Sequence, residues 1–147
     1  MKFSSFKQII TKSELVALDS NIFIYQFSQH PDFFIFSNYI FVALEKNKLQ
    51  AVTSIISYIE IISQSTIEGN QYSINLYKRI FQQYPNLKVH TADFQIADKT
   101  AELRRKYSIK TPDAIQLATA IISNVDLFIS NDKNLKKVEE IKTINFD

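Results

Sequence analysis

The chain has 147 residues, of which 46% are hydrophobic, and it contains one Gly and three Pro, so it predicts one domain spanning residues 1–147 rather than flexible linkers or a turn-rich all-β fold. It contains no Cys and two His, which excludes disulfides and thiolate metal sites, argues against a zinc cluster, and agrees with the cytoplasmic localisation that we expect. The net charge of +2 does not by itself indicate a nucleic-acid binder, and no apolar stretch is long enough for a signal peptide or membrane span.

Short apolar runs alternate with longer segments of helical periodicity along the chain. Strands are expected at residues 15–18, 49–53, 87–90, 127–130 and about 142–144. Helices are expected at residues 22–27, 33–46, 54 to about 65, 72–83, 91 or 93 to about 107, 111–122 and 134–138. The first and fourth strands are apolar throughout, as in a sheet covered on both faces. This alternation predicts an α/β fold, a three-layer α/β/α sandwich with a mainly parallel sheet.

The expected helix at residues 33–46 is unusually rich in aromatic residues. Its five rings, at Phe33, Phe34, Phe36, Tyr39 and Phe41, do not fit on one stripe at a period of 3.6 residues. We therefore expect part of this helix to contact something besides its own core, either a binding partner or, alternatively, a thick core with one or two exposed rings.

Asp19 ends the first apolar strand, where a second apolar run follows at once. An ionised carboxylate at the edge of a core is tolerated when it is hydrogen-bonded, paired or bound to a cation. The alternative is that Asp19 only caps the following helix through its side chain.

Glu60 lies in the helix that Ser54 is expected to cap, with Ile59 on the inward side. Because Ser54 directly follows the β-branched strand, Glu60 falls beyond the first turn, among apolar residues. The alternative is a capping box formed by Ser57 and Glu60, which would need no functional role for the acid.

Two further acids, Asp113 and Asp132, lie at the junctions of expected helices and strands. In the segment from Lys110 to Asp113, Thr111 is the expected N-cap and Pro112 the first helical residue, and an acid at this helix start is favoured by the helix dipole in any case. Asp132 follows the fourth strand, which is again apolar throughout.

The predicted fold brings these acids into one region. In an open parallel sheet, sites form outside the carboxyl ends of the strands, where Asp19 and Asp132 both lie. Asp113 and Glu60 reach the same crevice if their helices cover one edge of the sheet. Clustered acids without a matching cationic side chain favour a divalent metal, and all-oxygen ligands select Mg²⁺ or Mn²⁺. The implied reaction is hydrolysis of a phosphodiester bond.

Four segments, in order, resemble the motifs of PIN-domain ribonucleases and most of all the VapC-type toxins of toxin–antitoxin operons. They are residues 18–25 (LDSNIFIY), 53–60 (TSIISYIE), 111–120 (TPDAIQLATA) and 128–132 (FISND). The resemblance implies a Mg²⁺- or Mn²⁺-dependent endoribonuclease with Asp19, Glu60, Asp113 and Asp132 as the catalytic metal site. It also implies that Asn21, Ser130 and Ser54 support this site.

The sequence departs mildly from the family pattern. Ser130 stands where Thr is commoner, and Gln116 stands where His is frequent, which puts no expected metal ligand in doubt. Residues 1–14 form a longer N-terminal extension than usual, and their role is open.

An RNA substrate requires basic residues around the acidic site. The candidates for RNA contact are Lys110, Lys133, Arg104 and Arg105, although such charge runs are also typical of a solvated helix face.

The resemblance further implies an antitoxin protein that binds near the aromatic helix at residues 33–46, or a homodimer interface there. Two alternatives keep the same fold: a PIN nuclease of RNA processing that is not a toxin, and a non-catalytic binding module. A phosphatase with two acids after its first strand is disfavoured, because Asn21 occupies the position of the second acid.

Overall fold

The computed structural model describes residues 1–147. Its strands are β1 (Leu15–Leu18), β2 (Gln50–Ser54), β3 (Leu87–His90), β4 (Leu127–Ile129) and β5 (Thr143–Ile144). Its α-helices are α1 (Phe3–Thr11), α2 (Ser20–Phe27), α3 (Phe34–Glu45), α4 (Ile55–Ile62), α5 (Gln71–Gln83), α6 (Phe94–Tyr107) and α7 (Thr111–Ile122), with short 3-10 helices η1 (Ser65–Ile67) and η2 (Lys133–Lys137). None of these helices combines the length and apolar character that crossing a membrane requires.

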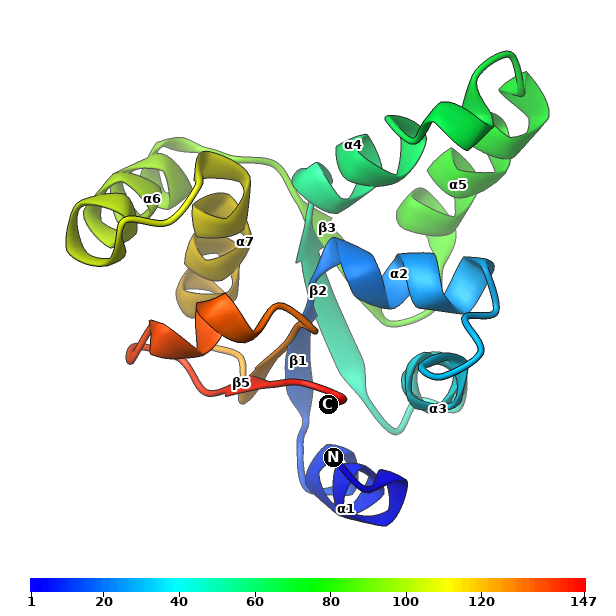
Figure 1. Ribbon diagram of the computed structural model, residues 1–147, viewed down its shortest axis with the longest axis horizontal. Helices are drawn as coiled ribbons and strands as arrows, with labels where there is room; N and C mark the ends of the chain where they lie inside the picture. The colour runs from blue at the N-terminus through cyan, green and yellow to red at the C-terminus, as the bar shows by residue number, and fades with distance from the viewer.

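The five strands form one sheet in the order β3-β2-β1-β4-β5, and every neighbouring pair is parallel. The predicted α/β fold with a parallel sheet is therefore confirmed (Figure 1). The chain runs outward from β1 through β2 to β3, and then returns to place β4 on the other side of β1. The strand order thus reverses between β1 and β4, and such a switch point is where open parallel sheets form ligand sites.

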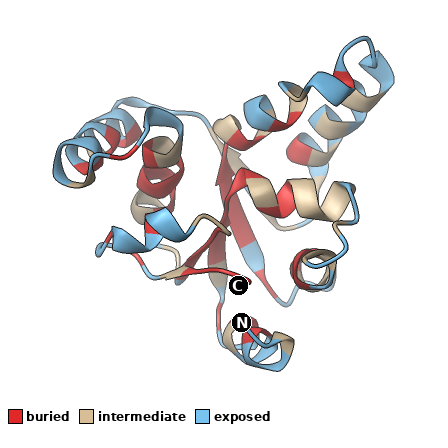
Figure 2. Cartoon of the chain, viewed as in Figure 1, coloured by how far each residue is buried: buried red, intermediate tan, exposed pale blue.

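Helices cover the sheet on both faces, which explains why its central strands are apolar throughout. Val16 and Leu18 of β1 pack into a core with α1 to α5, whereas Ala17 points into a second core with α6, α7 and η2. Figure 2 shows the buried residues concentrated along the strands and on the helix sides that meet them.

Most elements lie within a few residues of their expected bounds, but three details differ. Lys110, not Thr111, is the N-cap residue of α7, and no side chain caps that helix. The segment after Asp132 is a 3-10 helix rather than an α-helix. In α4, Ile59 is 47% exposed while Ile61 is buried, so the expected inward side was wrong by about half a turn.

The N-terminal extension, for which the sequence indicated no element, forms the amphipathic helix α1. Phe6 and Ile10, one turn apart, are buried against the rest of the protein. The ring of Phe6 lies edge-on to Phe36 of α3 and to Phe146, at centroid distances of 5.2 and 5.4 Å. The N-terminal ammonium group also donates to the carbonyl oxygen of Phe146 at 2.6 Å. The aromatic surplus of α3 is therefore used within the chain itself.

Candidate active site

Asp19 follows β1 at the switch point of the sheet, and it is only 6% exposed. Its Oδ1 accepts a hydrogen bond from the backbone N–H of Ser20 at 2.8 Å and so caps α2. Its Oδ2 accepts from the Ser130 hydroxyl at 2.6 Å and from Asn21 Nδ2 at 3.2 Å. Asp19 thus caps α2 with one carboxylate oxygen, as the alternative interpretation of the sequence expected. Its other oxygen accepts hydrogen bonds from the polar side chains of Asn21 and Ser130.

Burial raises the pKa of Asp19 from its ordinary 3.8 to about 6. The hydrogen bonds from Ser130 and Ser20 oppose this rise in pKa, and the negative charges of Glu60 and Asp113 add to it. No basic side chain forms an ion pair with Asp19. The carboxylate therefore lacks the cationic neighbour that would make its charged form inexpensive.

Glu60 is linked to Asp19 through Ser20. The Ser20 hydroxyl lies 3.0 Å from Glu60 Oε2 and 3.4 Å from Asp19 Oδ1. Partial desolvation raises the pKa of Glu60. The hydrogen bond from Ser20 lowers this pKa, and the negative charge of Asp113 raises it further. Sequence reasoning missed Ser20; its position directly after the acid, at the start of a helix, was the available signal.

The segment after β4 completes this polar cluster. The Ser130 hydroxyl donates to Asp19 and accepts from the backbone N–H of Asp132 at 3.1 Å. Asp132 Oδ1 accepts from the backbone N–H of Asn134 at 2.9 Å and thereby caps η2. The backbone of Asp132 is therefore linked to the Asp19 carboxylate through the Ser130 hydroxyl.

The C-terminal residues tether this segment from behind. Asn145 Nδ2 donates to the backbone oxygen of Ser130 at 2.7 Å. Asn131 Oδ1 accepts from the backbone N–H of Phe146 at 3.0 Å, and its Nδ2 donates to the Tyr25 hydroxyl at 3.3 Å. The segment after β4 is therefore fixed both to α2 and to the chain terminus, contacts that the sequence did not indicate.

Asp113 lies in the first turn of α7 and is half-buried. Burial, and next the charge of Asp132, raise the pKa of Asp113, while the charge of Lys110 opposes the rise. Asp113 and Asp132 line one cleft of about 240 Å³. The charges of Glu60 and Asp113 thus raise the pKa of Asp19, and the charge of Asp132 raises the pKa of Asp113, so the four predicted acids form one electrostatically coupled group.

Ser54, predicted as a supporting residue, lies at the N-terminus of α4. It is buried, and its hydroxyl accepts from the backbone N–H of Ile56 at 3.2 Å, capping α4. Its backbone N–H donates to Gln116 Oε1 at 3.4 Å. Ser54 fixes the helix that carries Glu60 but makes no hydrogen bond to any of the acids.

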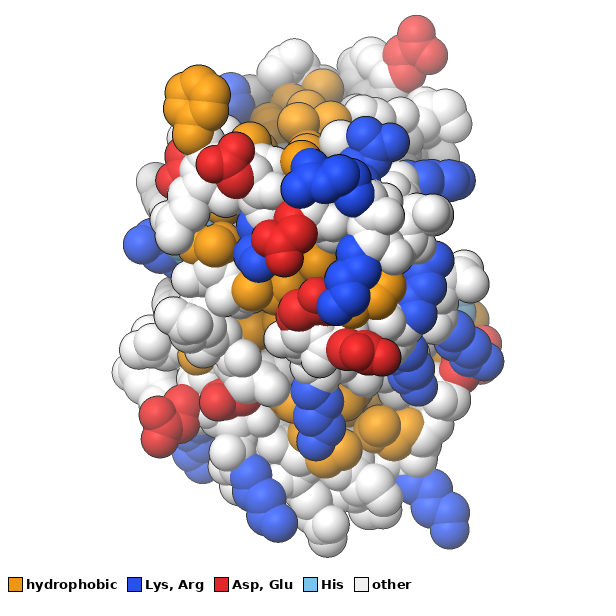
Figure 3. Space-filling model, turned by 90° about the vertical axis from the view of Figure 1, so that its left-hand side faces the viewer, with side chains coloured by type: hydrophobic (Ala, Val, Ile, Leu, Met, Phe, Trp, Pro, Cys, Tyr) orange, Lys and Arg blue, Asp and Glu red, His pale blue; other side chains and the backbone are white.

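Of the four candidates for RNA contact, Lys110 lines the cleft that contains Asp113 and Asp132. Lys133 is 3.5 Å from a carboxylate oxygen of Asp147, Arg104 Nε donates to the backbone oxygen of Ile109, and Arg105 lines a hollow between α6 and the end of α7. Figure 3 views the side that carries α6 and shows Lys and Arg side chains spread over it with acidic side chains between them. The basic residues form no continuous patch there.

The donor set of the acidic cluster fits a hard divalent cation. Every side chain of the cluster offers oxygen, and the pKa values of Asp19, Glu60 and Asp113 are raised first by burial and then by the negative charge of neighbouring acids. No three acidic or histidine side chains converge closely enough to enclose an ion. Mg²⁺ is commonly held by one or two carboxylates and several waters, so this spacing suits it.

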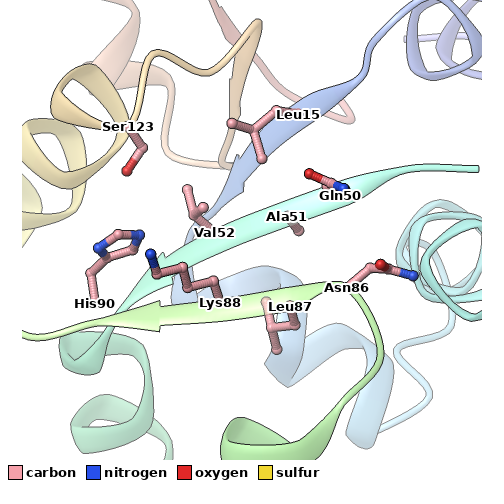
Figure 4. A pocket seen from close by; sticks show the side chains of 9 residues that line it. All are labelled: Leu15, Gln50, Ala51, Val52, Asn86, Leu87, Lys88, His90 and Ser123. Atoms are coloured by element: carbon pink, nitrogen blue, oxygen red, sulfur yellow. The ribbon is translucent and has the colours of Figure 1, made fainter. Parts of the chain in front are cut away.

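Another hollow, of about 430 Å³, lies on the face of β2 and β3 that α7 leaves open (Figure 4). The side chains of Lys88 and His90 point into it from the edge strand, opposite Ser123. No acidic residue lines this hollow, so it offers no comparable metal site.

Comparison with solved structures supports the fold. VapBC2 from Rickettsia felis, bound to a DNA fragment from its promoter, matches with a TM-score of 0.69 and 19% identity over 90% of this chain and 99% of that one. A toxin–antitoxin complex from Klebsiella pneumoniae matches with a TM-score of 0.63 and 24% identity over 86% and 94% of the two chains. VapBC-1 from nontypeable Haemophilus influenzae matches with a TM-score of 0.64 and 19% identity over 89% of this chain and 97% of that one.

No curated protein sequence matches this chain. Comparison with protein families, however, matches residues 16–141 to the PIN domain. The matched range starts in β1 and ends beyond η2, so it contains Asp19, Glu60, Asp113 and Asp132. The chain therefore belongs to the PIN-domain family.

Proposed function

We propose that this protein is a Mg²⁺- or Mn²⁺-dependent endoribonuclease and the toxin of a toxin–antitoxin pair. The observation that carries the proposal is Asp19, a buried carboxylate at the switch point of a PIN fold, with a raised pKa and no cationic partner. Glu60 and Asp113 add negative charge at the same place. Such an arrangement is expensive in the free protein and becomes favourable when a cation binds.

Of Asp19, Glu60, Asp113 and Asp132, one or two would hold the ion directly and the others would act through its bound waters. When bound, a divalent ion supplies a nucleophilic water at neutral pH and stabilises charge on the phosphoryl oxygens. Ser20, Asn21 and Ser130 orient Asp19, and the hydrogen bond from Ser130 favours its charged form. These contacts preorganise the carboxylate before an ion arrives, which limits the cost of ordering it on binding.

The direct test is cleavage of a mixed RNA pool by purified protein with Mg²⁺ or Mn²⁺. Wild-type protein should cut RNA, and EDTA should abolish cutting. Asp113→Asn should lower cleavage by at least about a hundredfold while the circular dichroism spectrum is unchanged, since the amide cannot replace a charged ligand. Cleavage that persists in EDTA, or an Asp113→Asn enzyme of wild-type rate, would contradict the proposal.

The toxin assignment rests on the fold of the solved neighbours, which are toxin–antitoxin complexes. Expression of the wild-type protein should arrest growth, Asp113→Asn should not, and co-expression of the adjacent reading frame should restore growth. An active nuclease that leaves growth unaffected would instead be a nuclease of RNA processing.

We further propose that the antitoxin binds near α3 and that the protein forms a homodimer. The buried rings of α3 already pack within the chain. The proposed antitoxin contact is therefore the first turn of α3, where Phe34 is half-buried and Ile35 is 51% exposed. Ile35→Glu should weaken antitoxin binding measured by calorimetry, whereas wild-type affinity in this variant would place the contact elsewhere. Sedimentation equilibrium of the toxin alone measures its oligomeric state.

A further inference from the structure

We propose that Gln116 is a positioning residue of the acidic site, because its buried amide fixes α7 against α4 and so sets the spacing of Asp113 and Glu60. Asp113 lies about one turn before Gln116 on α7. Ser57, the hydrogen-bond partner of Gln116, lies about one turn before Glu60 on α4. The inference rests on the proposed nuclease function and adds to it a residue that carries none of the acidic groups.

A buried chain of hydrogen bonds runs from α7 to the end of β1. Gln116 Nε2 donates to the Ser57 hydroxyl oxygen at 2.7 Å, and the hydroxyl oxygens of Ser57 and Thr53 lie 2.8 Å apart. The Thr53 hydroxyl donates to the carbonyl oxygen of Leu18 at 2.7 Å, just beyond the last β1–β2 pair. Gln116, Ser57 and Thr53 are 2%, 0% and 1% exposed. The chain therefore connects α7, α4, β2 and the strand that ends at Asp19.

The direction of these hydrogen bonds depends on Gln116. Each hydroxyl has one proton, and Thr53 uses its proton on Leu18, so Ser57 donates to Thr53 and accepts from Gln116. Only a donor at position 116 completes the chain. The other end of the same amide, Oε1, accepts from the backbone N–H of Ser54, the N-cap of α4, at 3.4 Å. Gln116 thus holds both the cap and the first turn of α4.

Apolar packing does not join α4 to α7. Ile61 of α4 belongs to the core on one face of the sheet, and Leu117 of α7 belongs to the core on the other face. Figure 1 shows the two helices on opposite sides of the strands, near the end where β1 leads into α2. The bond from Gln116 to Ser57 is the one hydrogen bond between these two helices. Their relative placement therefore depends on this polar bridge.

A buried polar bridge suits this task better than apolar contact does. Hydrogen bonds fix both distance and direction, and a fully satisfied buried network specifies one arrangement of the elements that it joins. Groups that act together at a site lose up to roughly a hundredfold in rate when one is misplaced by about 1 Å. The bridge lies about one helical turn from Asp113 and from Glu60, so a change in it moves both acids.

The first test measures the spacing of α4 and α7 in metal-free protein. The chain has no Cys, so Ile59→Cys on α4 and Thr111→Cys on α7, both at exposed positions, take spin labels selectively. Gln116→Met keeps the length of the side chain and removes the donor. It should shift or broaden the label distance by at least about 1 Å in electron paramagnetic resonance. Ser57→Ala should have the same effect, and the double substitution should add nothing, since both changes break one bond.

Thr119→Val is the matched control for this measurement. Thr119 is 1% exposed on the same helix and donates to the carbonyl oxygen of Ile115 within α7 at 2.7 Å. Its replacement removes a buried hydrogen bond without touching the bridge, so it should lower stability in urea unfolding and leave the label distance unchanged. Gln116→His keeps an N–H donor and should retain the wild-type distance. An unchanged distance in Gln116→Met, or the same change in Thr119→Val, would overturn the positioning role.

Calorimetric titration of Mn²⁺ into the same variants relates the spacing to the acidic site. Gln116→Met should weaken Mn²⁺ binding about tenfold, and Thr119→Val and Gln116→His should match wild type. A changed label distance with wild-type Mn²⁺ affinity would overturn the role of Gln116 at the site. Wild-type protein that binds no Mn²⁺ would contradict the proposed function, while the label distances would still decide whether Gln116 sets the spacing of the two acid-bearing helices.

Discussion

At the scale of the residue, Asp19 shows how much a single buried acid reveals. Its place after an apolar strand predicted a functional role, and the structure places Asn21 and Ser130 on its carboxylate as expected. Ser20 and Asn131 were missed, because their partners, the Glu60 carboxylate and the Phe146 backbone N–H, lie 40 and 15 residues away in the sequence. Ser54, predicted as a supporting residue, caps the helix that carries Glu60, as a serine at a strand-to-helix junction commonly does.

The raised pKa of Asp19 predicts how the stability of the metal-free protein varies with pH. The pKa of the Asp19 carboxyl rises from 3.8 to about 6 on folding. Between pH 3.8 and about pH 6 the folded state therefore keeps a proton that the unfolded state has lost. The contribution of Asp19 to the free energy of unfolding should therefore fall by about 2 kcal/mol as the pH rises from 4 to above 6. Urea unfolding in EDTA measures this dependence.

The matched variant for this experiment is Asp19→Asn, which cannot ionise. It should be more stable than wild type at pH 8 by about 1–3 kcal/mol and should lose most of that advantage at pH 4. The difference between the two pH profiles isolates Asp19 from the other titrating groups. Parallel profiles would show that burial of Asp19 carries no such cost.

At the scale of the element, helix and strand periodicity predicted the type of nearly every segment. The residues of α1 went unassigned, since the polar Ser4, Ser5 and Lys7 interrupt its apolar pattern and only packing against α3 reveals the buried side. The prediction of the inward side of α4 was wrong because isoleucines stand on more than one side of this helix, so hydrophobicity alone did not distinguish Ile59 from Ile61.

The tether between β5 and the segment after β4 predicts an effect on metal binding that a loss of stability alone would not produce. Asn145 is 1% exposed; its Nδ2 donates to the Ser130 carbonyl, but its Oδ1 has no partner. Asn145→Leu removes the tether and the unpaired oxygen together but leaves the buried Ser130 carbonyl without this donor, so stability should fall by about 1–3 kcal/mol. Mn²⁺ affinity should also fall about tenfold, as for other groups that orient metal ligands.

Titration calorimetry with Mn²⁺ and urea unfolding would be run on the same preparations. Ser37→Ala, which removes a buried hydrogen bond to Phe34 in α3, is the control and should leave Mn²⁺ affinity unchanged. An Asn145→Leu protein with wild-type Mn²⁺ affinity would show that the segment after β4 needs no tether.

At the scale of the whole molecule, alternating strands and helices predicted the layers and the parallel sheet, but not the strand order. That order depends on which side of β1 each crossover takes, and a single sequence carries little information on this choice. The meeting of the two termini was equally hidden, because it joins Met1 to Phe146 across 145 residues. Packing, rather than local pattern, decides both features.

The fold predicts opposite outcomes at two phenylalanines. Phe6 is fully buried between Phe36 and Phe146, whereas Phe94 at the start of α6 is 90% exposed. Phe6→Ala should cost about 3–5 kcal/mol of unfolding free energy, and Phe94→Ala should cost less than about 0.5 kcal/mol. Urea unfolding decides, and similar losses in the two variants would contradict the packing of α1 on the core.

The central claim is that the acids at the carboxyl end of β1 hold a divalent ion. The most direct measurement is calorimetric titration of Mn²⁺ into wild-type protein, Asp19→Asn and Asp126→Asn, since Asp126 is an exposed acid that binds backbone N–H groups at the other end of β1. Wild type and Asp126→Asn should bind Mn²⁺ alike, and Asp19→Asn should lose at least about tenfold in affinity. Equal Mn²⁺ affinity in all three proteins, or none in wild type, would contradict the metal site and the proposed chemistry.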